Sequence, residues 1–218
     1  MPLVEAKKQM TTLAQTCPQC GWTFDVEALR ANTCKKCRSA LLVTSIAYLE
    51  KFDSPAIQKY ITKYAEVLKG TPDDQDALLA IGICYVRLGL FDFADRYLQR
   101  LLAAHPEQAG GYYYRAICIL KGRRPRTASM NLIREIEQLA LTAMTLEPSN
   151  ARYDLLLAAI RHDYYVLNGL RVPEPKPPEL LSSIAIKHLD QLEAEQMFQL
   201  LKMDGSLIEA AIRGPGRV

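Results

Sequence analysis

Apolar residues recur at helical spacing through most of the chain after residue 45. The clearest run begins at Ser54-Pro55, a cap followed by proline in the first turn, and continues to Gly70. Its apolar side chains stand three or four residues apart, which brings them to one face of a helix. They are Ile57, Tyr60, Ile61, Tyr64, Val67 and Leu68. The pattern predicts a helix here and a shorter one before it over 41–51, and no strand-like alternation follows residue 45.

Prolines divide the following sequence into segments of similar length. Pro72 and Pro106 are about 34 residues apart, and both stand in short polar phrases of the kind that separate helices. The next interval, from Pro106 to Pro148, is longer by about eight residues, which indicates an insertion in the second unit. We place this insertion around 121–127, and we expect the second helix of that unit over about 129–146. The segment therefore predicts repeated helix pairs.

The unit between the first two prolines carries a characteristic set of apolar and small positions. They are Leu78, Ile81, Gly82, Tyr85, Leu88, Gly89, Leu90, Phe91, Ala94 and Leu98. In spacing they resemble a tetratricopeptide (TPR) repeat, with Leu78 in the usual tryptophan position and Leu98 in place of the usual aromatic residue. The resemblance puts Gly82 and Ala94 where the two helices of a repeat approach closely. It implies a mostly α protein, a short TPR-like α-solenoid.

The neighbouring unit keeps part of this pattern. Ala116-Ile117-Cys118 follows Gly82-Ile83-Cys84 at the interval that separates the first two prolines, so a small residue and a cysteine recur in register. We therefore expect Cys84 and Cys118 to occupy equivalent core positions rather than to act as ligands or nucleophiles. Arg115 stands where the family has leucine, which makes this second repeat less regular.

Local signals predict further helices and a linker downstream. A helix is expected over 151–168, because Asn168-Gly169 is a typical stop. The proline-rich segment 172–178 is expected to be stiff and extended. Beyond it we predict helices over 179–190 and 193–203, a capping box from Ser206 to Glu209 and a loose tail over 214–218.

Four of the six cysteines form two pairs with metal-ligand spacing. Cys17 and Cys20 make one pair, and Cys34 and Cys37 make the other. Two such turns let four thiolates surround a tetrahedral ion, and Gly21 supplies the positive φ that such a turn usually needs. A disulfide is disfavoured, because no signal-peptide-like stretch precedes the pairs. We expect one structural Zn²⁺ without an open coordination position; iron in a rubredoxin-like site is the alternative.

The cysteine pairs resemble those of a zinc ribbon, a likeness that covers about residues 10–45. It implies a small β module with strands near 12–16, 22–24 and 41–44. Trp22 and Phe24 are expected to cover a core too small to stand without metal. The predicted boundaries are a zinc ribbon over 1–45, TPR-like repeats over 46–171, a linker over 172–178 and C-terminal helices with a tail over 179–218.

The net charge of +3 resides in the N-terminal part. Residues 1–44 hold six basic and three acidic residues, whereas the rest of the chain is balanced. This differs from the strongly basic footprint of a dedicated nucleic-acid binder. Lys35, Lys36 and Arg38 either offset the net negative charge of a zinc tetrathiolate or contact phosphate.

Composition and motifs limit the remaining functional classes. Of 218 residues, 49% are hydrophobic and 23% charged, which allows a packed core. The apolar run over 41–49 is far shorter than the roughly 20 residues that span a bilayer, so we expect a soluble, cytoplasmic protein. The sequence has no glycine-rich phosphate loop, GxSxG elbow or HExxH motif, and its histidines lack metal spacing. We therefore expect neither an enzyme nor a small-molecule substrate.

The TPR resemblance implies a concave surface, lined by the first helix of each pair, that receives a peptide or helix. Its positions here are Leu79, Ile83, Val86, Tyr113, Ile117 and Leu120. They lack the Lys, Arg and Asn of repeats that hold acidic chaperone C-termini, so an apolar groove suited to an amphipathic helix is expected instead. Two occupants stay open, a partner protein or the chain's own C-terminal helices brought back by the linker.

Two functions are compatible with these features. The favoured one is a protein–protein interaction adaptor or scaffold, with the ribbon as a second docking surface or a cap on the solenoid. The alternative is a nucleic-acid-associated factor. Its phosphate contacts would be Lys35, Lys36, Arg38, Arg123, Arg124 and Arg126. The neutral charge of the repeat region favours the adaptor.

Overall fold

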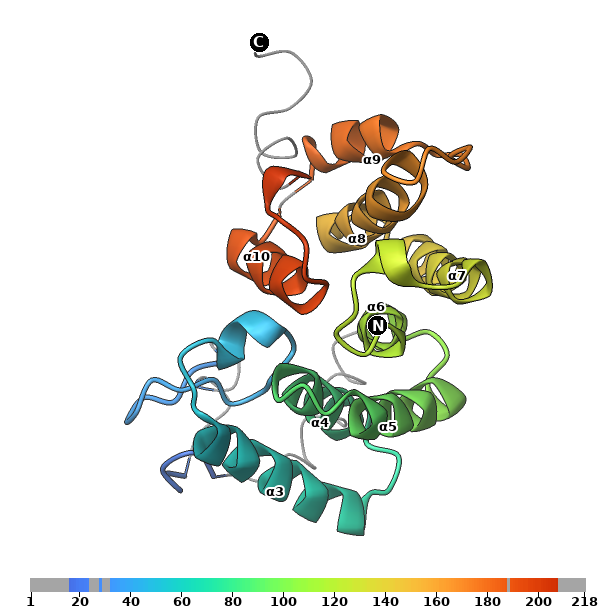
Figure 1. Ribbon diagram of the computed structural model, residues 1–218. Helices are drawn as coiled ribbons and strands as arrows, with labels where there is room; N and C mark the ends of the chain where they lie inside the picture. Colours follow the sequence, from blue (N-terminus) through green and yellow to red (C-terminus); the bar gives the residue numbers. More distant parts are fainter. Residues whose placement is uncertain (1–15, 24–27, 29–31, 188, 208–218) are drawn as a thin grey trace, which may run out of the picture.

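The computed structural model describes residues 16–23, 28, 32–187 and 189–207 (Figure 1). Helices dominate this part of the chain, as the apolar spacing predicts. The elements are η1 (Ile46–Leu49), α3 (Ser54–Gly70), α4 (Gln75–Arg87), α5 (Phe91–Ala104), α6 (Ala109–Ile119), η2 (Pro125–Thr127), α7 (Met130–Leu146), α8 (Ala151–Arg161), η3 (His162–Val166), α9 (Pro177–Ile184) and α10 (Gln191–Leu200). η1 and η2 are 3₁₀ helices, and η3 is a π-helical continuation of α8. None of the described helices is long and apolar enough to cross a membrane.

The helices stack in the order of the chain. Each helix from α3 to α8 packs against the next one, and α4 also contacts α6. The first helices of successive pairs therefore lie on the same side of the stack (Figure 1). α4 begins at Gln75 and α6 at Ala109, which keeps the period predicted from the prolines. Within the described residues the fold is a short TPR-like solenoid, as predicted.

Small residues allow the helices of a pair to approach closely. A Cβ added to Gly82 would lie 2.7 Å from the Leu98 Cδ2, so the predicted contact between α4 and α5 requires glycine. Gly111 on α6 is equally close to Leu102 of α5. Cys84 and Cys118 are buried in the main core, where the repeat register puts them.

The first repeat is less complete than its sequence suggests. Instead of a helix over 41–51, the chain forms η1 alone, capped by the Ser45 hydroxyl. Side-chain hydrogen bonds hold the segment before it: the Asn32 Oδ1 accepts from the Leu42 amide at 2.6 Å, and the Tyr64 hydroxyl accepts from the Val43 amide at 3.1 Å. These amides are thereby diverted from a helical ladder. The cap of α3 is also one residue earlier than predicted, because the Asp53 carboxylate accepts from the Ala56 amide.

The proline-rich segment is fixed to α8. α8 and η3 end as predicted near Gly169, which has a φ of +67°. The buried Arg161 guanidinium pairs with Glu137 of α7 at 2.6 Å and donates to the carbonyls of Pro173 and Pro175. These contacts hold the segment against the helices, so it is an anchored connection rather than a free spacer.

The two C-terminal helices are shorter than the sequence predicts. α9 ends at Ile184 rather than near residue 190, and α10 begins at Gln191 because the Asp190 carboxylate accepts from the Glu193 amide at 3.1 Å. α10 ends before Lys202, whose φ is +53°. Ser206 and Leu207 are helical, whereas Glu209 and the tail over 214–218 lie outside the described residues.

Within the described part of the chain, two hydrophobic clusters form the interior. The large one runs from Val43 to Leu207 and includes α9 and α10, so the C-terminal helices share the core of the repeats. The small one comprises Cys17, Ala28, Cys34 and Leu41, with Cys20 and Trp22 packed against it. The cysteine-containing segment thus has a core of its own.

The predicted β ribbon is not seen. The described residues around the cysteines form only two isolated antiparallel bridges, Thr16 with Thr23 and Thr33 with Ala40. The expected strand over 41–44 is wrong, because the amides of Leu41 and Leu42 bond to the backbone and side chain of Asn32. Residues 12–15 and Phe24 lie outside the described part of the chain.

Candidate functional site

The four paired cysteines lie together. Their sulfur atoms are all within 4.8 Å of one another. The Cys17 and Cys37 sulfurs are 3.6 Å apart, and the Cys20 and Cys34 sulfurs are 3.7 Å apart. Regular tetrahedral coordination with Zn–S bonds of about 2.3 Å separates the sulfurs by about 3.8 Å. The cluster therefore fits a tetrahedral metal ion, as its spacing in the sequence predicts.

The backbone of the two turns supports this arrangement. The Gly21 amide donates to the Cys17 carbonyl at 2.9 Å, and the Arg38 amide donates to the Cys34 carbonyl at 2.8 Å. Gly21 has a φ of +68°, as expected, and Arg38 has a φ of +61° in the equivalent position. The two turns are thus equivalent although only one contains glycine, a similarity that the sequence did not indicate.

The thiols of the cluster differ in their preference for a charge in the absence of a cation. Desolvation by burial raises the pKa of the Cys17 thiol to about 12, whereas at Cys37 desolvation is outweighed by hydrogen bonds from Ser39, which lower the pKa of its thiol to about 6. A bound cation reverses the preference of Cys17, because it stabilises thiolates and releases their protons. Four cysteine ligands fill a tetrahedral shell, so the residues suit a structural ion rather than a catalytic one.

Tyrosines of α3 fasten the cysteine segment to the repeats. The Tyr60 hydroxyl donates to the Ala40 carbonyl at 2.7 Å, and the Tyr64 hydroxyl donates to the Leu41 carbonyl at 3.2 Å. The Gln19 amide also donates to the Ala56 carbonyl at 2.7 Å. The cluster is therefore held against the N-terminal helix of the solenoid.

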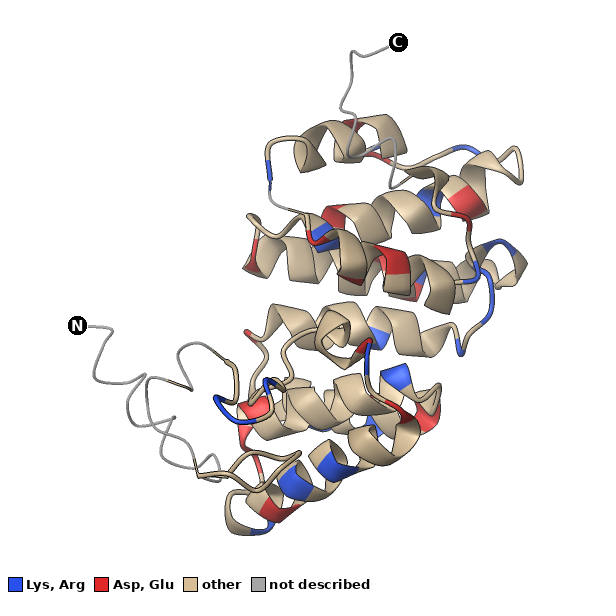
Figure 2. Ribbon diagram, turned by 90° about the vertical axis from the view of Figure 1, so that its left-hand side faces the viewer, with Lys and Arg blue, Asp and Glu red and all other residues tan. Residues whose placement is uncertain are grey.

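The predicted phosphate-contacting residues do not gather on one face. Lys35, Lys36 and Arg38 are exposed beside the cysteine cluster. In the other set, Arg124 pairs at 2.7 Å with the buried carboxylate of Asp163, and Arg123 and Arg126 are exposed. Basic and acidic positions are mixed over the ribbon in Figure 2. The basic loop over 121–126 is thus partly neutralised by the chain itself, since Lys121 also pairs with Asp92. The Arg126 guanidinium keeps its charge and donates to the neutral Asn168 side chain.

The predicted groove residues do not line an open groove. All six are buried, with exposed fractions between 0 and 6%: Leu79, Ile83, Val86, Tyr113, Ile117 and Leu120. These side chains are covered rather than exposed, as in the alternative in which the chain's own C-terminal helices fill the groove. η1 packs on α4, and α10 contacts both η1 and α8, so the chain's own elements occupy the concave side (Figure 1).

A buried carboxylate holds α10 on the repeats. Glu193 of α10 is 5% exposed, and its Oε1 accepts from the Tyr114 hydroxyl at 2.7 Å and from the Arg152 Nη1 at 3.0 Å. Tyr114 also links α6 to η1 by accepting from the Ile46 amide at 3.0 Å. Glu193 of α10 therefore connects directly to α6 and α8, and through Tyr114 it is also linked to η1.

Aromatic rings surround the guanidinium that receives this carboxylate. The Arg152 Cζ lies 5.1 Å from the ring centre of Tyr113, 5.9 Å from that of Tyr114 and 4.9 Å from that of Tyr153. Burial lowers the pKa of Arg152, but the neighbouring Glu193 carboxylate raises it above the usual range, so Arg152 stays charged. Burial also raises the pKa of Tyr113 and Tyr114 well above the ordinary value, which keeps both hydroxyls protonated.

This polar site was missed in the sequence. Tyr114 and Glu193 are 79 positions apart, and Arg152 precedes Glu193 by 41 positions. The run Tyr112-Tyr113-Tyr114 predicts at least one core tyrosine, and two of the three are buried. The available signal was Glu193 at the start of a predicted helix, next to the apolar Leu192 and Ala194.

Comparisons with known proteins give limited similarity. No protein-family model matches the chain, and no curated protein matches it. Among solved structures, one match is the crystal structure of a thermophilic TPR protein in Thermus thermophilus. It is 18% identical, covers 73% of this chain and 90% of that one, and has a TM-score of 0.44. The helix pairs of this chain and their regular period themselves define a short TPR-like solenoid, with a four-cysteine cluster beside its first helices.

Proposed function

We propose that this protein is a non-enzymatic protein-interaction scaffold. The concave side formed by α4, α6 and α8 binds an amphipathic helix of a partner, and the cysteine segment binds one structural Zn²⁺ beside the first repeat. The observation that carries this proposal is the packing of α10 on the concave side. The concave side already accepts a helix, because it buries the helix's apolar face together with one carboxylate.

The zinc assignment rests on the chemistry of the donor set. Four thiolates with sulfur separations of 3.6 and 3.7 Å suit tetrahedral Zn²⁺. The exposed Lys35, Lys36 and Arg38 lie beside these thiolates and offset their negative charge. Free thiols of this kind persist in a reducing compartment, which is consistent with a cytoplasmic protein.

Protein binding is favoured over nucleic-acid binding by the distribution of charge. A nucleic-acid surface presents several basic groups that are free to meet phosphates. Here Lys121 and Arg124 are paired with Asp92 and Asp163. The concave side, in contrast, combines apolar surface with the mostly covered Arg152.

The experiment is affinity capture from the native lysate, with and without nuclease. Tagged wild-type chain is compared with Glu193→Gln, which weakens the hold on α10, and with Glu195→Gln, which makes the same change at an exposed position of that helix. We expect nuclease-resistant partners that Glu193→Gln retains more strongly than Glu195→Gln does. Partners that disappear with nuclease, in all three samples, would instead establish nucleic-acid association.

A further inference from the structure

The buried polar site under α10 has a chemistry that specifies a partner. Resting on the proposed function, we infer that Arg152 and Tyr114 form a binding site for an acidic side chain on a partner helix, and that Glu193 is its exchangeable intramolecular occupant. The partner is thus an amphipathic helix with one Glu or Asp within its apolar face.

The site is built to receive a carboxylate. The Arg152 guanidinium lies against the rings of Tyr113, Tyr114 and Tyr153, so it is positioned before any ligand arrives. Its Nη2 donates to the Tyr153 hydroxyl at 2.9 Å, and that hydroxyl donates to Glu147 at 2.7 Å. The nearby Glu147 carboxylate thus binds the Tyr153 hydroxyl. Arg152 is therefore left to bind the carboxylate of a ligand.

Glu193 fills this site incompletely. A single oxygen, Oε1, takes both hydrogen bonds. Among the described residues, the buried Arg152 Nε and the buried Tyr113 hydroxyl have no hydrogen-bond partner. Arginine binds carboxylates best through two parallel hydrogen bonds, and an unpaired buried donor is unfavourable. A carboxylate entering from another helix would therefore gain by meeting a donor that Glu193 leaves unpaired.

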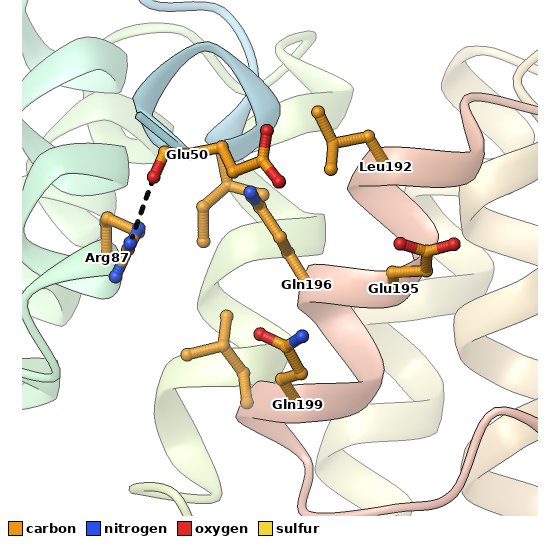
Figure 3. A pocket seen from close by; sticks show the side chains of 8 residues that line it. Glu50, Arg87, Leu192, Glu195, Gln196 and Gln199 are labelled. Atoms are coloured by element: carbon orange, nitrogen blue, oxygen red, sulfur yellow. Dashed lines mark hydrogen bonds between the residues drawn. The ribbon is translucent and has the colours of Figure 1, made fainter. Parts of the chain in front are cut away.

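α10 is also packed imperfectly on its other side. A pocket of about 210 Å³ lies between η1, the end of α4 and α10, lined in part by Glu50, Arg87 and Gln196 (Figure 3). Gln196 is 7% exposed, yet no described residue bonds to its Oε1. A second pocket of about 290 Å³ lies beside the Arg152–Glu193 pair itself. Both pockets leave space along the edges of α10 where a replacing helix can begin its contacts.

The position of α10 in the chain permits exchange. It has ten residues and follows α9, which packs separately on α8. Departure of α10 would remove its Asp190 cap and Glu193 together, while the contacts from α3 to α9 remain. Because α10 is tethered, it competes with a free ligand at a high effective concentration, so the apparent affinity of the ligand is lower in the intact chain.

The buried face of α10 gives the pattern expected of the partner. Counted from Glu193, buried apolar residues follow at +1, +4, +5 and +8. They are Ala194, Met197, Phe198 and Leu201. This is the spacing of one helix face. An acidic residue followed by apolar residues at those offsets is therefore the recognition pattern that we infer.

The test uses a synthetic peptide of residues 187–203 as the probe, added to the full chain and followed by fluorescence anisotropy. We expect the Glu193→Gln chain to bind this peptide at least tenfold more tightly than the wild-type chain does, because its own α10 competes less well. A peptide with Gln at position 193 should bind at least tenfold more weakly to the same chain. The Glu195→Gln chain and a peptide with Gln at position 195 are the matched controls and should behave as wild type. Equal binding of the two peptides, or no binding, would overturn the inference.

A second measurement needs no altered chain. Hydrogen exchange of the ¹⁵N-labelled wild-type chain is followed with excess unlabelled peptide. Amides of α10 should lose protection while those of α8 keep it, and the peptide with Gln at position 193 should have little effect. Unchanged α10 protection would contradict exchange. If the peptide does not displace α10 but nuclease-resistant partners are still captured, this inference fails and the proposed scaffold function stands. If the peptide displaces α10 but no such partners are captured, the proposed function fails and this inference stands.

Discussion

At the residue scale, Arg38 shows how a local conformation escapes sequence reasoning. Gly21 predicts a positive φ, but Arg38 has the same conformation without any such signal, in a turn that its amide closes on the Cys34 carbonyl. A side chain with a Cβ is strained in this region by about 1 kcal/mol. The cysteine spacing predicts the metal ligands, but the backbone conformation of Arg38 is seen only in the folded turn.

Replacing Arg38 with glycine should therefore strengthen metal binding. Relief of strain is partly offset by the greater freedom of glycine in the unfolded chain and by the loss of one positive charge beside the thiolates, so we expect a net gain of about 0.5 kcal/mol, or roughly a twofold higher zinc affinity. Competition with a chromophoric chelator measures this affinity. Lys36→Gly removes the same charge at a position without positive φ and should lower the affinity; equal effects of both changes would refute the strain argument.

The six cysteines should react in two classes. Burial raises the pKa of Cys84 and Cys118 far above the usual range, so their thiols stay protonated and covered near neutral pH. Chelation of the metal should open the small core around the cluster, so we expect rapid modification of the four clustered cysteines and slow modification of these two. Mass spectrometry after timed labelling counts them. Fast labelling of all six in a chain that keeps its helical circular dichroism would contradict the buried positions.

At the scale of elements, the helix pairs were predictable because their signals are local. Apolar spacing, proline boundaries and the recurrence of small residues in register lie within single helices or adjacent ones. The predicted strand over 41–44 failed because Asn32 and Tyr64, which bind that segment, act from distant positions. The seat of α10 was likewise hidden, since Glu193 meets Arg152 and Tyr114 only in the folded chain.

The docking of the cysteine segment on α3 should depend on Tyr64. Its buried hydroxyl accepts from the Val43 amide and donates to the Leu41 carbonyl. Tyr64→Phe would leave both backbone groups unpaired, which should destabilise the chain by about 1–3 kcal/mol. Thermal unfolding of the metal-loaded protein measures the change. Tyr48→Phe alters an exposed tyrosine in the neighbouring 3₁₀ helix and should have little effect; similar losses in both variants would argue against the docking contact.

At the scale of the whole molecule, two separate cores predict a partial response to loss of metal. The cluster around Cys17 and Cys34 is distinct from the core that runs from Val43 to Leu207. Cys20→Ser should therefore abolish stoichiometric zinc while leaving most of the helical circular dichroism. Metal analysis and far-ultraviolet spectra test both parts. A collapse of the helical signal would show that the repeats depend on the cysteine cluster.

The seat of α10 also has a mechanical consequence for the solenoid. Repeats of this kind ordinarily contact only their neighbours, so small changes between adjacent repeats can add up to a change in the curvature of the stack. Here α10 contacts η1 at one end of the stack and α8 near the other, so it connects the two ends directly. A partner helix that replaces α10 would make the same connection. Whatever occupies the concave side therefore sets the curvature of the whole stack and the distance between its two ends.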